Sequence, residues 1–263
     1  MQSRATVLHV TSATVFDYAR IIYIVLKGYA IANIVAENRG VIAVLSFALG
    51  SAVGQGACMS VYLHEEDLPA GVLAEGPVAV DTETMGLITA RDRLCLLQIS
   101  DGRGDEHLVR FGRDSDYSAP NLRAVLADPA RVKLFHYARF DLAAISHYLH
   151  VVATPLFCTK IASRLTRTYT DRHGLKELVK EMLGTDISKQ QQSSDWGGPV
   201  LSEAQKDYAA SDVRYLHRLH NEFVIRLERE GRTQLAQACF DFLPYRADLD
   251  LAGWPEIDIF GHS

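Results

Sequence analysis

Val78-Ala79-Val80-Asp81-Thr82-Glu83-Thr84-Met85-Gly86-Leu87 is the stretch around which the rest of the chain is organised. A short apolar run leads into two carboxylates at alternate positions, and a glycine follows. Residues i and i+2 of a β-strand point to the same face, so Asp81 and Glu83 should stand side by side at a strand end. Two like charges that close need a counter-charge, and a divalent cation is the usual one. Taken alone, the pattern fits a surface strand end with two solvated acids equally well.

The composition is that of a globular chain with a mild acidic balance. The 263 residues are 48% hydrophobic and 22% charged, which suits one compact α/β domain with some additional sequence. The net charge of -5 argues against a protein that coats long nucleic acid, but not against a nucleic-acid enzyme whose site carboxylates are neutralised by metal. The four cysteines form no CxxC pair, so we expect neither a zinc site nor disulfides, and a cytoplasmic location fits.

Residues 1–58 differ in character from the rest of the chain. Their two apolar runs, 21–26 and 41–49, are shorter than the roughly 18 uncharged residues of a membrane-spanning helix, so no stable membrane partner is expected. The segment could be a loose extension, a weakly membrane-associating segment, or upstream sequence read from a start codon that is not the natural one. We favour the third interpretation, because Met59 stands where the domain-like pattern of residues 59–263 begins.

From residue 61 onward, strand and helix patterns follow one another. We predict strands at 61–63, 78–83, 93–100, 107–111, 132–135 and 156–158. Helical spacing is found at 120–126 and 138–149, and further helices are expected to about residue 230. A three-strand meander followed by strand–helix alternation predicts a mixed sheet with helices on both faces, and then a C-terminal tail.

Two further acidic positions extend the pattern of the first strand. Asp141 should lie in the first turn of the 138–149 helix, where its carboxylate meets the positive end of the helix dipole. Tyr208 and Asp212 are separated by four positions and share a helix face. Each feature has an ordinary alternative, since Asp is common in a first helical turn and Tyr208 could be a core residue.

In this order and spacing, the acidic residues and the tyrosine resemble the tyrosine-containing branch of the DEDD 3′–5′ exonucleases, the ribonuclease D-like proteins. The resemblance implies an α/β, RNase H-like fold with a five-stranded mixed sheet flanked by helices. It also implies that Asp81, Glu83, Asp141 and Asp212 are metal carboxylates and that Tyr208 is catalytic. Two divalent cations, Mg²⁺ or Mn²⁺, would activate water and relieve charge on the phosphate.

Three further blocks, 157–177, 187–196 and 253–260, are similar to nano-RNase C, a group of short bacterial relatives of ribonuclease D. This resemblance implies hydrolysis of short oligoribonucleotides and of dinucleotides such as pGpG to nucleoside 5′-monophosphates. It also implies a homo-octamer, for which the apolar C-terminal residues Ile257, Ile259 and Phe260 could supply an interface. The family pattern has no counterpart of residues 1–58.

Possible substrate contacts adjoin the first two acidic motifs. Thr84 and Leu87 follow the acidic strand, and Leu87 could wedge between two bases or belong to the core. His136 and Arg139 precede Asp141 and could touch substrate, although a histidine at a strand end is often a hydrogen-bonded structural residue.

The polar block at 187–196 offers further contacts. Lys189 and Gln192 could donate to phosphate, while Trp196 could stack on a base or pack in the core. The basic residues of the preceding block could bind phosphate or form salt bridges between subunits, and they are Arg164, Arg167, Arg172 and His173.

Two rival functions remain open at this point. The protein could be an exonuclease on longer or structured RNA, as in tRNA 3′ processing, or on single-stranded DNA. It could also be an inactive nucleic-acid-binding module, but nothing supports inactivation, because all four carboxylates and the tyrosine are present.

Overall fold

A computed structural model describes residues 6–10, 18–26, 29–38, 41–49, 60–188 and 190–262. The chain divides into two units, residues 1–57 and residues 58–263. The first unit contains an antiparallel meander in the order β1 (Thr6–Val10), β2 (Tyr18–Leu26), β3 (Tyr29–Asn38) and β4 (Val41–Leu49). The two apolar runs noted in the sequence coincide with β2 and β4. The sequence analysis predicts no strands for these two runs, so β2 and β4 are additional to the predicted elements.

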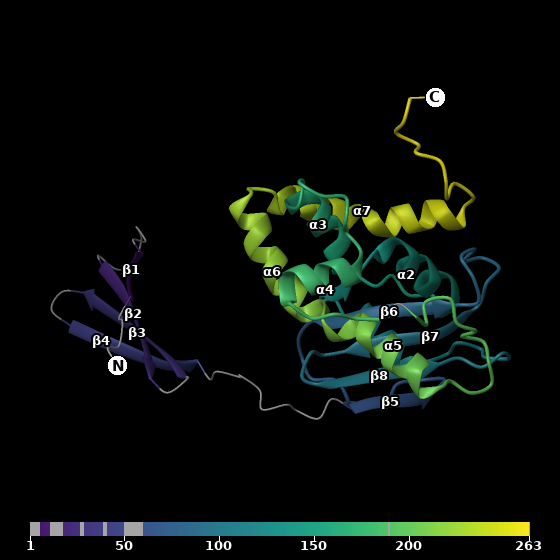
Figure 1. Cartoon of the computed structure of the whole chain (residues 1–263), viewed down its shortest axis with the longest axis horizontal. Helices are drawn as coiled ribbons and strands as arrows, with labels where there is room; N and C mark the ends of the chain where they lie inside the picture. The colour runs from purple at the N-terminus through teal and green to yellow at the C-terminus, as the bar shows by residue number, and fades with distance from the viewer. Residues whose placement is uncertain are drawn as a thin grey trace. The chain divides into compact units, whose positions relative to one another are not determined.

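The second unit is built on a mixed sheet in the order β10-β9-β6-β7-β8-β5, drawn in Figure 1. Its strands are β5 (Ser60–Glu65), β6 (Val78–Thr84), β7 (Leu94–Ser100), β8 (Asp105–Arg110), β9 (Lys133–Phe135) and β10 (Leu156–Cys158). Strands β6, β7 and β8 form the predicted antiparallel meander. Among the described residues the sheet has six strands, one more than the family resemblance implied, and β5 lies at the edge parallel to β8.

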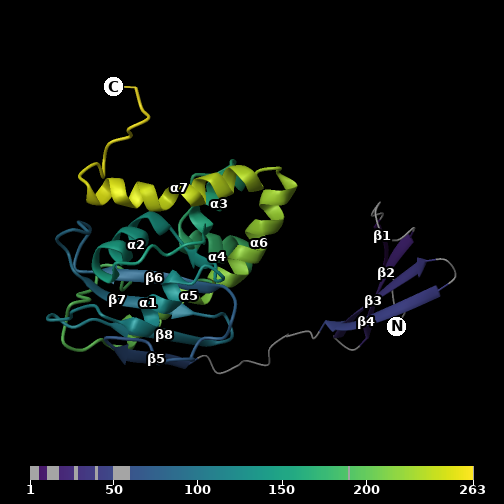
Figure 2. The ribbon, with the colours of Figure 1, turned by 180° about the vertical axis from the view of Figure 1, so that it is seen from behind.

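Helices cover both faces of this sheet, as predicted. They are α1 (Pro120–Ala127), α2 (Ala138–Ala144) with its π-helical continuation η1 (Ile145–Leu149), α3 (Thr159–Thr166), α4 (Leu175–Leu183), α5 (Glu203–Arg214), α6 (Leu216–Arg229) and α7 (Thr233–Leu251). Alternation along β7 places Leu97 in the large core cluster that includes Leu122 of α1, whereas Leu96 lies on the other face, in the cluster that includes Ala209 of α5. Figure 2, turned by 180° from Figure 1, brings α1 into view.

Helix α7 was missed by the sequence analysis, which expected a tail after about residue 230. Its 19 residues include Pro244, which removes a backbone donor and is an ordinary signal for a helix end. The helix nevertheless continues through the proline, because Ala236, Phe240, Leu243 and Ala247 are buried along one side. Tertiary packing on α2 and α3 therefore overrides the local signal (Figure 1).

Helix α5 is fixed over the sheet at both of its ends. At its N-terminus, Ser202 and Gln205 form a capping box in which each side chain bonds the backbone N–H of the other residue. At its C-terminus, Arg214 Nε lies 3.0 Å from the Glu106 carboxylate of β8, and Glu106 is only 2% exposed. The residues on the underside of α5 are thereby held against β6, β7 and β8.

Candidate active site

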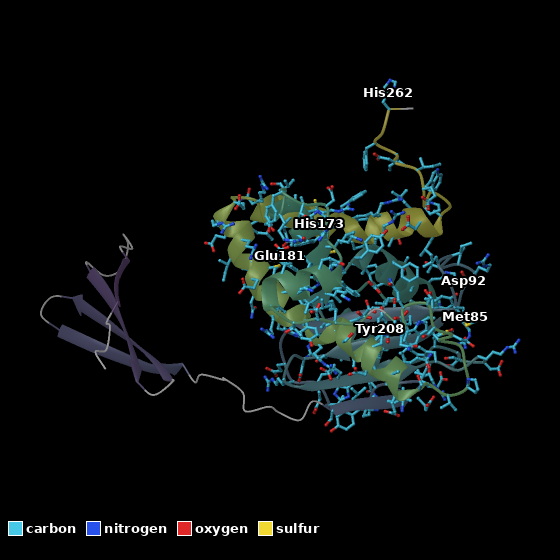
Figure 3. The ribbon with its side chains drawn as sticks, in the orientation of Figure 1. Met85, Asp92, His173, Glu181, Tyr208 and His262 are labelled. Atoms are coloured by element: carbon cyan, nitrogen blue, oxygen red, sulfur yellow. The ribbon has the colours of Figure 1, made fainter. Side chains whose placement is uncertain are left out.

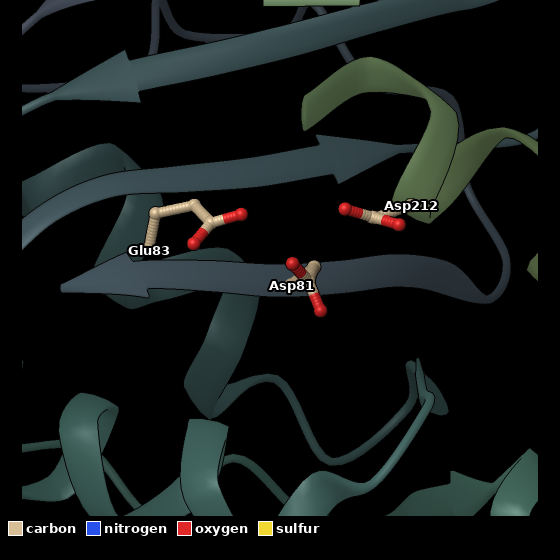
Figure 4. A group of neighbouring side chains, drawn as sticks. All are labelled: Asp81, Glu83 and Asp212. Carbon is tan, nitrogen blue, oxygen red and sulfur yellow. The ribbon is translucent and has the colours of Figure 1, made fainter. Parts of the chain in front are cut away.

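Three carboxylates meet where α5 crosses β6 (Figure 4). Asp81 and Glu83 occupy alternate positions of β6 and face α5, and the side chain of Asp212 extends from α5 towards them. One carboxylate oxygen from each residue lies within 4.8 Å of those of the other two. The convergence predicted from the Asp-x-Glu pattern and the later Tyr-x-x-x-Asp pattern is therefore present in the folded chain.

Asp141 approaches the same cluster from α2. It lies in the first turn of that helix, as predicted, and is 3% exposed. The hydroxyl of Thr82 donates a hydrogen bond of 2.7 Å to Asp141 Oδ1, which ties α2 to β6. The negative charge of Asp141 raises the pKa of Asp81, so the fourth carboxylate lies close enough to act on the cluster.

Burial and mutual repulsion make the carboxylates difficult to ionise together. Burial is the main cause that raises the pKa of Glu83 to about 9, and the charges of Asp212 and Asp141 add to it. Burial also raises the pKa of Asp81 well above its usual range, reinforced by Asp141, Asp212 and Glu83. For Asp141, burial raises the pKa to about 7 against the opposing hydrogen bonds of Thr82.

The donor set fits a hard divalent cation. All the converging groups are carboxylates, which Mg²⁺ and Mn²⁺ prefer over nitrogen or sulfur ligands. A cation among them would offset the repulsion that keeps the cluster protonated. Asp81, Glu83 and Asp212 are therefore suited to hold metal, with Asp141 beside them.

Tyr208 lies one helical turn before Asp212 on the same face of α5, at the position labelled in Figure 3. Its hydroxyl hydrogen-bonds the Asp212 side chain. Burial is the largest cause that raises the pKa of this phenol above its usual range, and the charges of Asp212, Glu83 and Asp81 act in the same direction. The hydroxyl is thus a proton-bearing group directed into the acidic cluster.

A four-carboxylate site with an adjacent tyrosine on a mixed sheet is the arrangement of a phosphodiester-cleaving family, and comparison with known sequences identifies it. The sequence profile described as 3′–5′ exonuclease matches residues 63–228. The chain belongs to this family. The match spans the strands and helices that carry Asp81, Asp141 and Asp212.

Solved structures place the exonuclease more closely, among the ribonuclease D-like, NrnC-type nucleases. Brucella melitensis NrnC bound to pGG is 54% identical, with a TM-score of 0.75 over 78% of this chain and 100% of that chain. The same protein with bound Mg²⁺ is 53% identical, with a TM-score of 0.74 over 78% and 100% of the two chains. Escherichia coli RNase D is more distant, at 27% identity and a TM-score of 0.58 over 65% of this chain and 44% of that chain.

Curated relatives agree with this placement. Ribonuclease D of Gluconacetobacter diazotrophicus is 37% identical over 155 residues, which are 59% of this chain and 39% of that protein. Ribonuclease D of Acidiphilium cryptum is 36% identical over 159 residues, which are 60% of this chain and 40% of that protein. The chain thus spans about two fifths of the length of these relatives.

The loop after β6 presents apolar side chains next to the acidic strand. Leu87 is 87% exposed, so it does not belong to the core and is available for contact with a base. Asp92 closes the loop by accepting hydrogen bonds from the Ile88 N–H at 3.0 Å and from Arg91 Nε at 2.7 Å. A Cβ at Gly86 would lie 2.4 Å from the Asp92 carboxylate, so a side chain at this position would displace Asp92. Figure 3 labels Met85 and Asp92 at the two ends of this loop.

Other candidate contact residues have structural partners. The hydroxyl of Thr84 donates to the carbonyl of Gly86. His136 Nδ1 lies 2.9 Å from the hydroxyl of Thr159, which is the structural alternative considered for it. Arg139 forms a two-pronged ion pair with Asp250 of α7, with both N···O distances at 2.6 Å, so it joins α2 to the C-terminal helix.

The residues of the polar block at 187–196 differ in their exposure and in what they contact. Trp196 is 3% exposed and its ring centroid lies 6.0 Å from that of Tyr208, so it packs behind the tyrosine instead of stacking on a base. Gln192 is exposed, and Lys189 lies outside the described residues. Beside the block, a cavity of about 280 Å³ is bordered by Gln190, Gln191 and Tyr208, among others.

The basic residues of the 157–177 block include one that is fully internal. Arg167 is 0% exposed, and its guanidinium bonds Glu181, Ser163 and the carbonyl of Arg172 within the chain. His173 Nδ1 lies 2.8 Å from the hydroxyl of Ser163. Figure 3 shows His173 and Glu181 among the helices, away from Met85 and Asp92. Arg167 therefore serves the fold, and neither of the roles considered for it, phosphate binding or an intersubunit bridge, applies.

Sequence reasoning overlooked Gln98 of β7. This amide is 0% exposed and is paired in register with Asp81 on the neighbouring strand. Its only signal in the sequence is a single polar residue within the apolar run Leu94-Cys95-Leu96-Leu97-Gln98-Ile99. A polar interruption in a strand that is buried on both faces could have marked it as a candidate.

The raised pKa values predict that the metal-stripped exonuclease loses stability as pH rises. Glu83 titrates at about 9 in the folded protein against 4.5 ordinarily, so between these values the folded state holds more protons than the unfolded chain. The free energy of unfolding must therefore fall as pH rises through that window. We expect the thermal midpoint of the metal-stripped protein to drop by about 4 °C or more from pH 5 to pH 9.

Glu83→Gln provides the control for this prediction, because it removes one titrating group and should reduce the pH dependence, to which Asp81 and Asp141 still contribute. Added Mg²⁺ should restore the midpoint at high pH by stabilising the ionised cluster. A midpoint that does not depend on pH, or that rises between pH 5 and pH 9 equally in both proteins, would contradict it.

Proposed function

We propose that this exonuclease hydrolyses short oligoribonucleotides and 5′-phosphorylated dinucleotides of the pGpG type to nucleoside 5′-monophosphates. The convergence of Asp81, Glu83 and Asp212 beside Tyr208 carries the proposal, because it joins a cation-binding carboxylate cluster to a proton-bearing hydroxyl. The match along the whole of Brucella melitensis NrnC, which has been solved with bound pGG, supports a short substrate.

Four carboxylates would hold two divalent cations, Mg²⁺ or Mn²⁺, and the Mg²⁺ bound to Brucella melitensis NrnC supports the first of these. When bound, the ions supply a polarised water and neutralise charge on the phosphate. Asp81, which lies close to Glu83 and Asp212 and whose pKa is also raised by Asp141, would serve both ions. Glu83 and Asp212 would complete one position and Asp141 the other. Tyr208 would orient the attacking water through its hydroxyl. As a phenolate, with its pKa lowered by bound cations, it would instead take a proton from that water.

Substrate contacts would come from both sides of the carboxylates. Leu87, exposed on the loop after β6, would contact the bases. Gln192 and Lys189 would donate hydrogen bonds to phosphate, and His136 would contact substrate from the end of β9. Three of the candidate residues would act indirectly. Thr84 would support the loop after β6, Arg139 would hold α7, and Trp196 would pack behind Tyr208.

A length series of 5′-phosphorylated RNAs tests the function. We expect pGpG to be hydrolysed at least as efficiently as RNAs several nucleotides longer. The reason is that the binding free energy of a short substrate must come from contacts to its bases and its 5′ phosphate. A charge-assisted contact to that phosphate contributes more than a neutral one, so GpG should bind about 10-fold or more weakly. The measurements are kcat/KM for each length and Kd for both dinucleotides, with Mg²⁺ and with Mn²⁺.

The competing function is ribonuclease D-like processing of longer or structured RNA, or hydrolysis of single-stranded DNA. Efficiency that climbs steadily with length and ignores the 5′ phosphate would support it and would overturn the dinucleotide assignment. Single-stranded DNA of matched length serves as a parallel substrate in the same assay.

Assembly and location form a second part of the proposal. A homo-oligomer, an octamer by family resemblance, is supported by Ile257, Ile259 and Phe260, which are 48–77% exposed in the C-terminal segment. In the described parts of the chain, Cys95, Cys158 and Cys239 are free thiols, which fits a reducing cytoplasm. None of the helices described could span a membrane.

A protein that begins at Met59 should fold and hydrolyse pGpG as well as the full chain. The reason is that residues 1–57 form a separate unit, while the carboxylates and Tyr208 belong to residues 58–263. We expect kcat/KM, thermal midpoint and oligomer size to be unchanged on truncation. Insolubility, or loss of assembly or activity in the shortened protein, would instead show that the first unit is integral.

A further inference from the structure

Gln98 of β7 carries a buried side-chain amide. Its side chain is 0% exposed, and within the described part of the chain neither Oε1 nor Nε2 has a hydrogen-bond partner. Burying an amide without partners costs free energy, which an apolar side chain of similar size would avoid. Stability of the fold therefore gives no reason for an amide at this position.

The position of Gln98 shows which group it can reach. In the antiparallel pairing of β6 with β7, Gln98 lies directly opposite Asp81, and on its other side it pairs with Leu108 of β8. Directly opposed residues of antiparallel strands project from the same face with their Cβ atoms about 5 Å apart. Gln98 thus shares with Asp81 the face of the sheet that α5 covers.

The buried cluster on this face is mostly apolar. Leu96, Leu108 and Ala209 belong to it and offer neither a donor nor an acceptor. Of its other members, Cys95 donates to the carbonyl of Arg93, and Trp196 offers only the donor Nε1. The carboxylate of Asp81 is the polar side chain at the opposed position, and it can accept two or more hydrogen bonds once it is ionised. Gln98 Nε2 is a donor suited to it.

We propose that Gln98 is a positioning residue for the cation site, whose amide N–H donates to the Asp81 carboxylate when that carboxylate holds a cation. The inference rests on the proposed function. Groups that hydrogen-bond a metal-ligating carboxylate fix its orientation, and their removal commonly weakens metal binding by about 10- to 100-fold. Gln98 does not touch substrate and acts only through Asp81.

Gln98→Met tests this inference, because methionine has a similar length and no amide. Mn²⁺ is titrated into the metal-stripped full chain and binding is followed by calorimetry, with Gln234→Met, an exposed glutamine of α7, as the matched control. We expect about 10- to 100-fold weaker Mn²⁺ binding for Gln98→Met only. The thermal midpoint of its metal-stripped form should equal or exceed that of the wild type, because the unpartnered amide is gone. Turnover of Gln98→Met should recover as the Mn²⁺ concentration is raised.

Three results would overturn the inference. The first is wild-type Mn²⁺ affinity in Gln98→Met. The second is weaker binding accompanied by a lowered midpoint of the metal-stripped form, which marks a merely structural residue. The third is a loss of turnover that high Mn²⁺ does not restore. If Gln98→Met does not fold, Gln98→Leu is measured against the same criteria, and failure of both to fold also overturns it. In each of these cases a wild type that binds Mn²⁺ and hydrolyses pGpG leaves the proposed function standing.

Discussion

Asp81→Ala should lower the rate of pGpG hydrolysis by about 10³-fold or more, the largest effect we expect from a single substitution. A carboxylate oxygen of Asp81 lies within 4.8 Å of those of Glu83 and Asp212, and the charge of Asp141 also raises its pKa, so its removal deprives the cluster of one of its cation ligands. Mn²⁺ binding to the metal-stripped protein should weaken in parallel. Turnover and calorimetric titration, measured on the same preparation, check both parts.

The matched control is Asp114→Ala, which removes an exposed aspartate from the turn after β8. It should leave turnover and Mn²⁺ binding unchanged. Alanine at Glu83, Asp141 or Asp212 should remove nearly all hydrolysis in the same way. Near-normal turnover in the Asp81, Asp141 or Asp212 variant, with the protein folded, would refute the two-cation assignment.

Tyr208→Phe should cost about 10²- to 10⁴-fold in kcat while leaving Mn²⁺ affinity close to that of the wild type. The substitution keeps the ring that packs against Trp196 and removes only the hydroxyl that bonds Asp212. The fold and the carboxylates should therefore stay in place, and the loss should fall on the chemical step. Single-turnover rates with saturating pGpG and Mn²⁺ measure it.

Tyr245→Phe, at a tyrosine of α7 that is 65% exposed, is the corresponding control and should be silent. A Tyr208→Phe protein with wild-type kcat would show that the hydroxyl takes no part in the reaction. A protein with unchanged kcat and a weakened Kd for pGpG would assign the tyrosine to substrate binding instead.

Local patterns were sufficient to predict the sheet meander and the elements that carry the acidic residues. Alternation in β6 placed Asp81 and Glu83 on one face, and a four-residue spacing placed Tyr208 above Asp212 on α5. Both statements concern neighbours within a single element, where the period of the backbone dictates the direction of each side chain. The same reasoning failed for α7, because Pro244 is a local signal that packing of the helix outweighs.

Exposure of individual side chains could not be read from their sequence neighbourhoods. Leu87 and Trp196 each had two interpretations, and the fold makes the leucine exposed and the tryptophan buried. Arg139 adjoins Asp141 in the sequence, yet its guanidinium is held by Asp250, more than 100 positions away. Such pairings depend on which elements lie side by side, and no local period encodes them.

The sequence by itself determined which residue types the site has and which elements present them, because strand and helix periods act over a few residues. Only the tertiary structure decided that Asp212 of α5 comes within 4.8 Å of Asp81 and Glu83 of β6, and that Asp141 joins them through Thr82. It also decided that Gln98 lies opposite Asp81 with no hydrogen-bond partner for its amide among the described residues. The physical reason is that long-range register is set by packing of the whole sheet under α5, and this packing buries the acids and raises their pKa.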